Sequence, residues 1–286
     1  MSHRRHFWIV PFLVLVLHPR PCRTDERGDE SPAAPAVELL TTSAGIQFGV
    51  LGPKPKAPAA TLFVFAHELK ATLESDDYNK VGRLLATKGF VCVALDLPCH
   101  GRNVRAGEPQ GLDGWAARLR QDEDPIGPFV REATEVLDHL IAAGYTDRER
   151  VTACGTSRGG FVALHFAAAE PRVRCVAAFA PVTELPVLRE FKGLEAHAKT
   201  KQLALLRHAE KLAGRPGWLC IGNDDERVGT DQAIAFTRAV VAASKAKQRR
   251  PLVELHVMTS AGHTIHPTAH AEAAAWIAEQ TKSAAN

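Results

Sequence analysis

The chain has 286 residues, 45% of them hydrophobic, and a formal net charge of +3 at pH 7. It is long enough for two small domains or one large α/β domain with a sizeable core. Four arginines precede the first acidic residue, Asp25, so the remainder carries a formal charge of about −1, which argues against a nucleic-acid partner.

The N-terminus has the pattern of a targeting segment. Arg4 and Arg5 form a basic start, and Phe7–Leu17 is an apolar run. This run is too short to span a bilayer, which needs about 20 residues, so residues 1–24 predict a signal peptide rather than a stable membrane span. We therefore expect an exported protein, periplasmic or secreted, although no A-x-A cleavage site follows the apolar run. Residues 25–36 are polar and rich in Pro and Ala, as in a linker.

The rest of the chain alternates between predicted strands and helices. Val37–Leu51 predicts an edge hairpin. Continuous apolar runs predict strands covered on both faces, at 61–67, 90–96, 173–181, 217–224 and 253–258. Helices are expected at 76–88, 126–143, 158–169, 230–246 and 268–282. This alternation predicts a mainly parallel, doubly wound α/β sheet in one domain, 37–286, with a small helical lid inserted at about 183–214.

The cysteines within predicted strands are predicted to be core residues. Cys92, Cys154, Cys175 and Cys220 each lie inside a predicted strand, where cysteine usually behaves as a small buried hydrophobe. We expect neither disulfides nor metal ligation from them.

A candidate nucleophile lies in Val151–Gly160, VTACGTSRGG. An apolar strand ends there at G-x-S-x-G, and an Ala-rich helix follows. A serine on so sharp a turn needs neighbours without Cβ atoms, which Gly155 and Gly159 supply. Ser157 is therefore expected at the carboxyl end of a strand, where α/β sheets place their ligands.

A serine hydroxyl needs a base, and the base needs an orienting acid. Asp224 and Asp225 follow the strand that ends in LCIG, and His263 follows the last predicted strand. The order Ser, Asp, His is the one that a strand–turn–helix nucleophile demands in this architecture. We predict Ser157, Asp225 and His263 as the catalytic residues, with Asp224 capping or bracing the turn.

His263, His266 and His270 could alternatively suggest a metal site on a helix face. Pro267 interrupts that helix, and His263 follows Gly262 in a turn. The base role is therefore favoured for His263, and neither a metal nor an organic cofactor is implied.

The oxyanion of an acyl-transfer reaction requires two backbone N–H donors. One is expected from Arg158, the residue after the nucleophile. The other is expected from the loop after strand 61–67, with Leu69 as the candidate. The side chain of Arg158 could position an acidic substrate group, but pairing with a nearby acid is expected instead.

Four motifs in order carry a resemblance to a known superfamily: the elbow at 155–159, the loop DLPCHGRN, the turn IGNDDERVG and the tetrapeptide SAGH. Together they resemble the α/β-hydrolase superfamily, in particular its dienelactone-hydrolase and prolyl-oligopeptidase-like branch, over roughly residues 60–282. The resemblance implies the α/β-hydrolase fold. One departure is that His67 is followed by Glu68 where these proteins usually have glycine, which places a charge beside the oxyanion loop.

These features predict a serine hydrolase that cleaves a small-molecule carboxylic ester through an acyl-enzyme. A peptidase of the prolyl oligopeptidase type is the alternative within enzymes. A non-catalytic binding protein with this fold is the alternative outside them, and Glu68 is the feature that favours it.

Overall fold

A computed structural model describes residues 36–282 of the chain. The predictions of a signal peptide at 1–24 and of most of the linker at 25–36 lie outside these residues. Within the described part, no helix combines the length and the apolar character that a membrane crossing requires.

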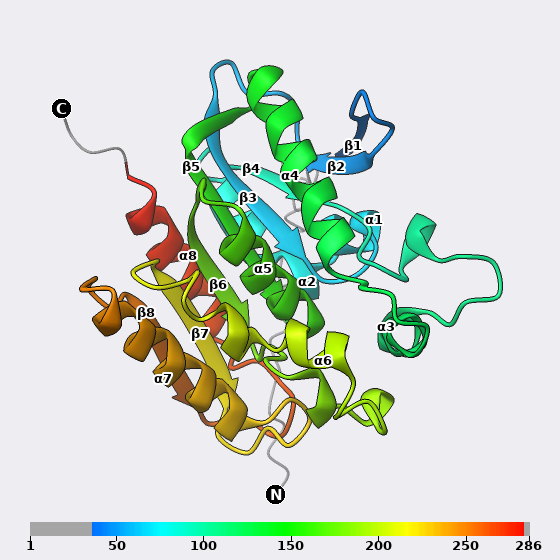
Figure 1. Cartoon of the computed structure of the whole chain (residues 1–286). Helices are drawn as coiled ribbons and strands as arrows, with labels where there is room; N and C mark the ends of the chain where they lie inside the picture. The colour runs from blue at the N-terminus through cyan, green and yellow to red at the C-terminus, as the bar shows by residue number, and fades with distance from the viewer. Residues whose placement is uncertain (1–35, 283–286) are drawn as a thin grey trace, which may run out of the picture. The chain divides into compact units, whose positions relative to one another are not determined.

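The described residues are organised around an eight-stranded sheet with the order β1-β2-β4-β3-β5-β6-β7-β8 (Figure 1). The strands are β1 Val37–Thr41, β2 Gln47–Leu51, β3 Ala59–Phe65, β4 Val91–Ala94, β5 Thr146–Thr156, β6 Val173–Phe179, β7 Gly217–Gly222 and β8 Val253–Met258. The six neighbouring strands β4, β3, β5, β6, β7 and β8 pair in parallel. The hairpin β1–β2 adds to the β4 edge with antiparallel pairing. The predicted mainly parallel α/β sheet is confirmed.

Helices cover both faces of this sheet. They are α1 Leu69–Glu74, α2 Asp76–Ala86, α3 Gly111–Arg120, α4 Gly127–Ala142, α5 Arg158–Ala169, α6 Ala198–Leu203, α7 Thr230–Ala246 and α8 Ala269–Gln280. Buried residues of α3, α4, α5 and α7 join one core cluster, whereas those of α2 and α8 join another. Connections that return over alternate faces are what a doubly wound sheet requires.

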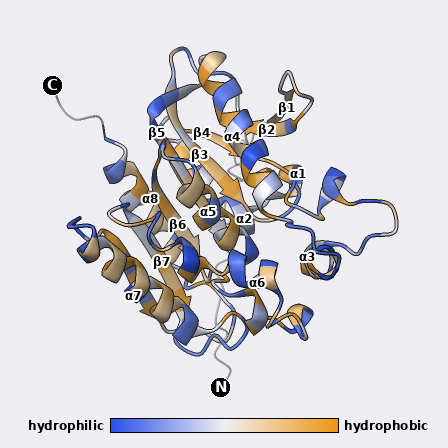
Figure 2. Cartoon of the chain, in the orientation of Figure 1, coloured by the Kyte–Doolittle hydropathy of each residue, from blue (hydrophilic) through white to orange (hydrophobic). Residues whose placement is uncertain are grey.

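The central strands are buried on both faces, as their continuous apolar sequences predict. Figure 2 shows β3 in the hydrophobic colours, whereas α4 is mixed along its length. Residues that alternate along a strand enter opposite clusters: Phe63 belongs to the first, and Leu62 and Val64 to the second. The cysteines predicted as core residues are buried and free, and burial raises the pKa of the Cys92 and Cys220 thiols to about 12.

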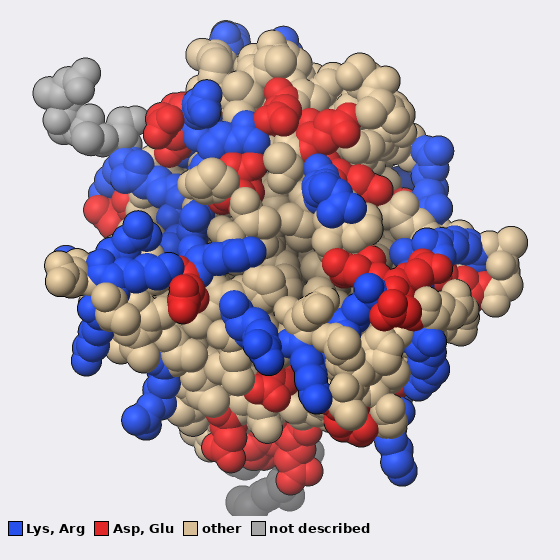
Figure 3. All heavy atoms as spheres, viewed as in Figure 1, with Lys and Arg blue, Asp and Glu red and all other residues tan. Residues whose placement is uncertain are grey.

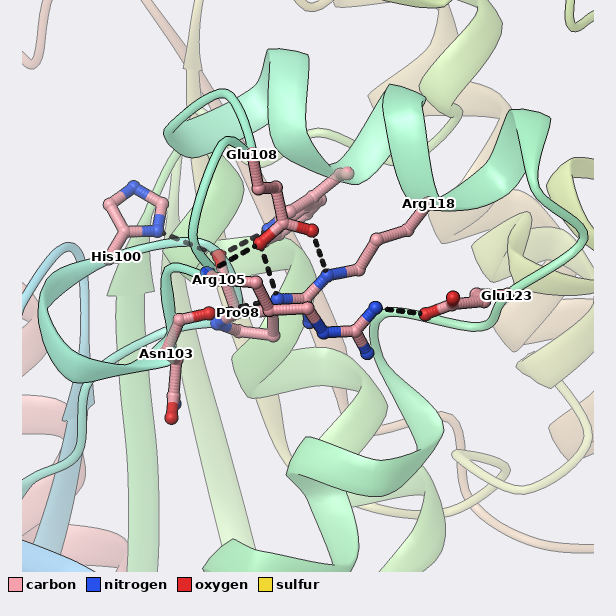
Figure 4. Close-up of polar contacts among 8 residues, drawn as sticks. Pro98, His100, Asn103, Arg105, Glu108, Arg118 and Glu123 are labelled. Carbon is pink, nitrogen blue, oxygen red and sulfur yellow. Dashed lines mark hydrogen bonds and ion pairs between the residues drawn. The ribbon is translucent and has the colours of Figure 1, made fainter.

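A network of polar contacts holds the segment between β4 and α4 in place (Figure 4). Arg118, on α3, binds Glu108 through two hydrogen bonds, Nε to Oε1 at 2.6 Å and Nη2 to Oε2 at 2.8 Å. The indole N–H of Trp115, which is fully buried, donates to the carbonyl oxygen of Pro98 at 2.7 Å. Figure 3 shows acidic and basic side chains interleaved at the side of the molecule where Figure 1 places α3. These contacts fix a segment that has little hydrophobic periodicity of its own.

The Glu108–Arg118 pair predicts a specific pH dependence of stability. The hydrogen bonds from Arg118 lower the pKa of Glu108 from 4.5 to about 2, and the two side chains are only 10% and 12% exposed. A carboxyl whose folded pKa is depressed contributes stability above its unfolded pKa and loses that contribution as the pH falls toward its folded pKa. We therefore expect Glu108→Gln to lower the free energy of unfolding at pH 7 by up to about 3 kcal/mol.

Urea unfolding at several pH values measures this effect. The difference between the wild type and Glu108→Gln should be largest above pH 5 and should shrink toward pH 2–3, because Glu108 becomes protonated there. Glu149→Gln is the matched control, since the Glu149 side chain is 83% exposed and its contact with Arg148 is 4.0 Å long. A difference for Glu108→Gln that is the same at pH 6 and pH 3 would contradict the assignment.

The segment 183–214 connects β6 to β7. It contains three short 3₁₀ helices, Leu185–Val187, Arg189–Phe191 and Leu205–His208, in addition to α6. The expected helical insertion is therefore helical only in these short pieces, which cover about half of the segment and are separated by turns and irregular stretches. Its apolar side chains Leu185, Leu188 and Phe191 enter the first core cluster, so the segment is packed against the domain. Glu190 also accepts two hydrogen bonds from Arg227, in the turn after β7, at 2.9 and 2.7 Å.

Candidate active site

Ser157 stands between β5 and α5 in a backbone conformation that non-glycine residues rarely adopt. Its φ is 55° and its ψ is −116°. The surrounding hydrogen bonds maintain this strain: the Ser157 N–H donates to the carbonyl oxygen of Phe179 at 2.8 Å, and the Ser157 carbonyl oxygen accepts from Val182 at 3.2 Å. A strained serine on a strand-to-helix turn is the geometry of a nucleophile elbow.

The two flanking glycines have the steric reason that the sequence predicts. A Cβ on Gly159 would lie 1.8 Å from the carbonyl oxygen of Phe65, in β3, and a Cβ on Gly155 would lie 2.3 Å from the Gly159 backbone. Neither clash could be relieved by moving a side chain alone, because the neighbouring atoms are backbone. The glycines thus let β3, β5 and α5 approach closely enough to form the turn.

The acid and the imidazole come to Ser157 from the turns after β7 and β8. His263 Nε2 lies 3.0 Å from Ser157 Oγ, and His263 Nδ1 lies 2.8 Å from Asp225 Oδ2. The Asp225 side chain has no exposed surface, whereas that of His263 is 29% exposed. The structure therefore brings the three residues of the predicted triad into one continuous chain of hydrogen bonds.

Asp225 is held rigidly by the turn that carries it. Its other oxygen, Oδ1, accepts the backbone N–H groups of Arg227 at 3.0 Å and Val228 at 3.2 Å. These donors satisfy the buried carboxylate and aim Oδ2 at the imidazole. Asp224 instead lies exposed, and its Oδ1 accepts the N–H of Gly262 at 3.2 Å, which braces the loop just before His263.

The other two histidines of the C-terminal segment lie in different surroundings. His266 Nδ1 contacts Thr268 Oγ1 at 3.0 Å, and the ring of His270 stacks on Phe179 with centroids 4.7 Å apart. Within residues 36–282, no group of His, Cys, Asp and Glu side chains has the arrangement of a metal site.

The predicted oxyanion donors differ in their availability. Arg158 is the first residue of α5, so its N–H has no partner inside the helix. The N–H of Leu69, however, donates to Asp96 Oδ1 at 2.7 Å. Because the buried Asp96 carboxylate occupies this donor, the structure disagrees with the expectation that Leu69 stabilises the oxyanion. His67 is also engaged, since its N–H donates to Thr72 Oγ1 at 3.1 Å.

The side chain of Arg158 also departs from expectation. Its Nε donates to the carbonyl oxygen of Ala66 at 3.1 Å, so the side chain crosses the end of β3. None of the ion pairs formed within residues 36–282 includes its guanidinium. The expected pairing of Arg158 with a nearby acid is therefore not found.

The parallel sheet, the strained serine and the chain of hydrogen bonds define a protein of the α/β-hydrolase superfamily. Residues 114–284 match the prolyl oligopeptidase family, and the chain belongs to this family of hydrolases.

Individual relatives include both esterases and peptidases. The chain is 24% identical to Esterase YjfP of Escherichia coli over 187 residues, which cover 59% of this chain and 71% of that protein. Acetyl xylan esterase 1 of Thermoanaerobacterium superposes with a TM-score of 0.57 and 19% identity, over 87% of this chain and 89% of that one. Dipeptidyl peptidase 4 of Porphyromonas gingivalis superposes with a TM-score of 0.62 and 15% identity, over 86% of this chain. The chain spans only 35% of the length of that peptidase.

Proposed function

We propose that the chain is a serine hydrolase that cleaves a carboxylic ester through an acyl-enzyme. The observation that carries the proposal is the hydrogen-bonded series Asp225, His263, Ser157 at the carboxyl ends of β7, β8 and β5. The esterases among the relatives, YjfP and acetyl xylan esterase 1, support the choice of an ester.

The proposed reaction uses the three side chains in sequence. The proton of the imidazole sits on Nδ1, where it is donated to Asp225 Oδ2, so Nε2 has a lone pair directed at Ser157 Oγ. Nε2 takes the hydroxyl proton as Oγ attacks the ester carbonyl, and it then gives this proton to the departing alcohol. Water repeats the same two steps and releases the acid.

The negative charge that develops on the carbonyl oxygen needs two donors. The Arg158 N–H at the start of α5 is one. For the second we assign the N–H of Glu68, because the neighbouring N–H groups of His67 and Leu69 are occupied by Thr72 and Asp96. Glu68 precedes α1 as its N-cap residue. A backbone donor does not depend on the side chain, so the glutamate is compatible with turnover.

Labelling with a fluorophosphonate tests this proposal. The reagent reacts with a serine only when a base activates it, so the folded wild type should be labelled at Ser157 within minutes and Ser157→Ala should not be labelled. A folded wild type that remains unlabelled would favour the non-catalytic binding protein instead.

A panel of esters and the corresponding amides then separates the two kinds of enzyme. We expect a higher kcat/KM for the p-nitrophenyl ester of an acyl group than for the matching p-nitroanilide. A preference for the anilides of dipeptides would support the peptidase, as in the dipeptidyl peptidase that shares this fold.

A further inference from the structure

The guanidinium of Arg158 is a positive charge beside the nucleophile that has no negatively charged partner among residues 36–282. It is partly buried, and its one side-chain hydrogen bond is the contact from Nε to Ala66. The two terminal nitrogens, Nη1 and Nη2, have no acceptor among residues 36–282. A guanidinium beside the nucleophile whose terminal nitrogens have no protein acceptor can bind an anion through both of them.

An acid whose charge acts on Arg158 is already paired with another arginine. Glu190 accepts two hydrogen bonds from Arg227, and its side chain is only 10% exposed. Burial lowers the pKa of Arg158, and the positive charge of Arg227 lowers it further, whereas Tyr78 and Glu190 oppose this effect. A guanidinium nevertheless stays protonated at neutral pH, so the site keeps its positive charge.

In each of two histidines next to Arg158, one ring nitrogen also has no partner within the described part of the chain. His100 is 3% exposed, and its Nε2 is buried without a hydrogen bond, as is Nδ1 of His67. Figure 4 shows His100 joined to the carbonyl oxygen of Pro98 and apart from the Glu108–Arg118 pair. Burial and the positive charge of Arg158 lower the pKa of His100 to about 4. The imidazole therefore does not add a competing positive charge at neutral pH.

Two of the unpartnered atoms, His100 Nε2 and Arg158 Nη1, lie close to one point beside Gly111. The point where a Cβ on Gly111 would sit lies 3.6 Å from His100 Nε2 and 3.9 Å from Arg158 Nη1. The rings of His67 and His100 meet edge to face, with centroids 4.6 Å apart. A polar group of the substrate that entered this space would meet the guanidinium and an imidazole together.

The sheet order indicates which part of the substrate reaches this space. β3 neighbours β5 on one side, and β6, β7 and β8 follow on the other. His263 comes from the β8 side, so an alcohol that it protonates leaves on that side. The Arg158 side chain crosses the end of β3, so its guanidinium lies on the other side of β5, away from the side on which the alcohol leaves.

From this geometry, and resting on the proposed ester hydrolysis, we infer that Arg158 binds a carboxylate on the acyl part of the substrate. The two free nitrogens can bind both carboxylate oxygens through parallel N–H···O hydrogen bonds. The substrate class is therefore half-esters of dicarboxylic acids, in which one carboxyl is esterified and the other is free.

The first test compares two p-nitrophenyl esters with acyl chains of similar length, the hydrogen glutarate and the hexanoate. The wild type should favour the glutarate in kcat/KM by at least about tenfold, because a hydrogen bond to a charged group is involved. Arg158→Met should reduce this ratio about 10- to 100-fold. Arg158→Lys should retain part of it, because lysine keeps the positive charge but cannot form two parallel hydrogen bonds to a carboxylate. Arg148→Met, at a side chain that is 67% exposed, is the control and should leave the ratio unchanged.

The second test measures binding without turnover. Free glutarate should bind to Ser157→Ala in calorimetry and should bind at least about tenfold more weakly to the double variant Ser157→Ala/Arg158→Met. If the wild type hydrolysed both esters equally and the Arg158 variants did not change the ratio, the inference about Arg158 would be wrong. The proposed ester hydrolysis would still stand. Glutarate binding that depends on Arg158, without hydrolysis of either ester, would retain the anion site and refute the proposed function. Glutarate binding that is the same in both variants would overturn the anion site.

Discussion

Ser157→Ala is expected to lower kcat for a short p-nitrophenyl ester by about 10⁴-fold or more. The substitution removes the only atom that can form the acyl-enzyme, while the helix, the turn and the His263–Asp225 hydrogen bond remain. Alanine requires the same positive φ as serine at this position, so the backbone strain is retained in the variant. The thermal midpoint should therefore stay within a few degrees of the wild type.

Initial rates and a thermal melt on the same preparations measure this prediction. Ser43→Ala is a suitable control, because Ser43 is exposed in the turn between β1 and β2, far along the chain from the elbow. It should retain the activity of the wild type. Undiminished hydrolysis by Ser157→Ala would mean that another residue is the nucleophile.

The elbow was predictable because its local geometry leaves so little choice of sequence. Two backbones pass at Gly159 with no room for a Cβ, and this requirement appears in the sequence as G-x-S-x-G. The acid and the base were predictable for a related reason. Each follows a buried strand, and the carboxyl ends of parallel strands meet at one edge of the sheet, so Asp225 and His263 come to Ser157 from distant parts of the chain.

Two helices were not predicted, since their sequences carry weak signals. α1 is only six residues long, and its N-cap residue Glu68 makes no side-chain cap. α3 contains two glycines, which lower helix propensity. Gly114 is required there by tertiary contacts, because a Cβ would lie 2.3 Å from the carbonyl oxygen of Pro109. Such a contact is invisible in the local sequence.

The sequence also could not predict whether a particular N–H group or guanidinium already has a hydrogen-bond partner. Leu69 loses its role because Asp96, 27 residues away, accepts its N–H. Among residues 36–282, Arg158 has no acid as an ion-pair partner, whereas Arg227 pairs with Glu190 from a different connection of the fold. Partner selection of this kind depends on side-chain packing, which residue spacing does not encode.

Asp225→Asn is the second substitution with a large expected effect, about 10⁴-fold in kcat. The reason lies in the two backbone N–H groups that donate to Oδ1. In the variant, the amide oxygen must remain at these two donors, because an NH₂ group cannot accept from them. The NH₂ group then takes the place of Oδ2 and faces His263 Nδ1.

This arrangement forces the wrong tautomer on the imidazole. Nδ1 must accept from the amide, so the ring proton moves to Nε2, which then donates toward Ser157 Oγ and cannot take its proton. The ¹⁵N shifts of the His263 ring should report a proton on Nδ1 in the wild type and on Nε2 in Asp225→Asn. This signature separates a change of tautomer from a general loosening of the turn.

Asp224→Asn provides the matched comparison, since it makes the same chemical change one residue away. Asp224 contacts the N–H of Gly262 and does not touch the imidazole, so its loss should reduce kcat far less than the loss of Asp225 and should leave the His263 tautomer unaltered. If Asp224→Asn were the more damaging of the two, the acid of the triad would have to be reassigned. If Asp225→Asn kept kcat within tenfold of the wild type with the ring proton still on Nδ1, the orientation of the imidazole would not depend on a carboxylate at this position.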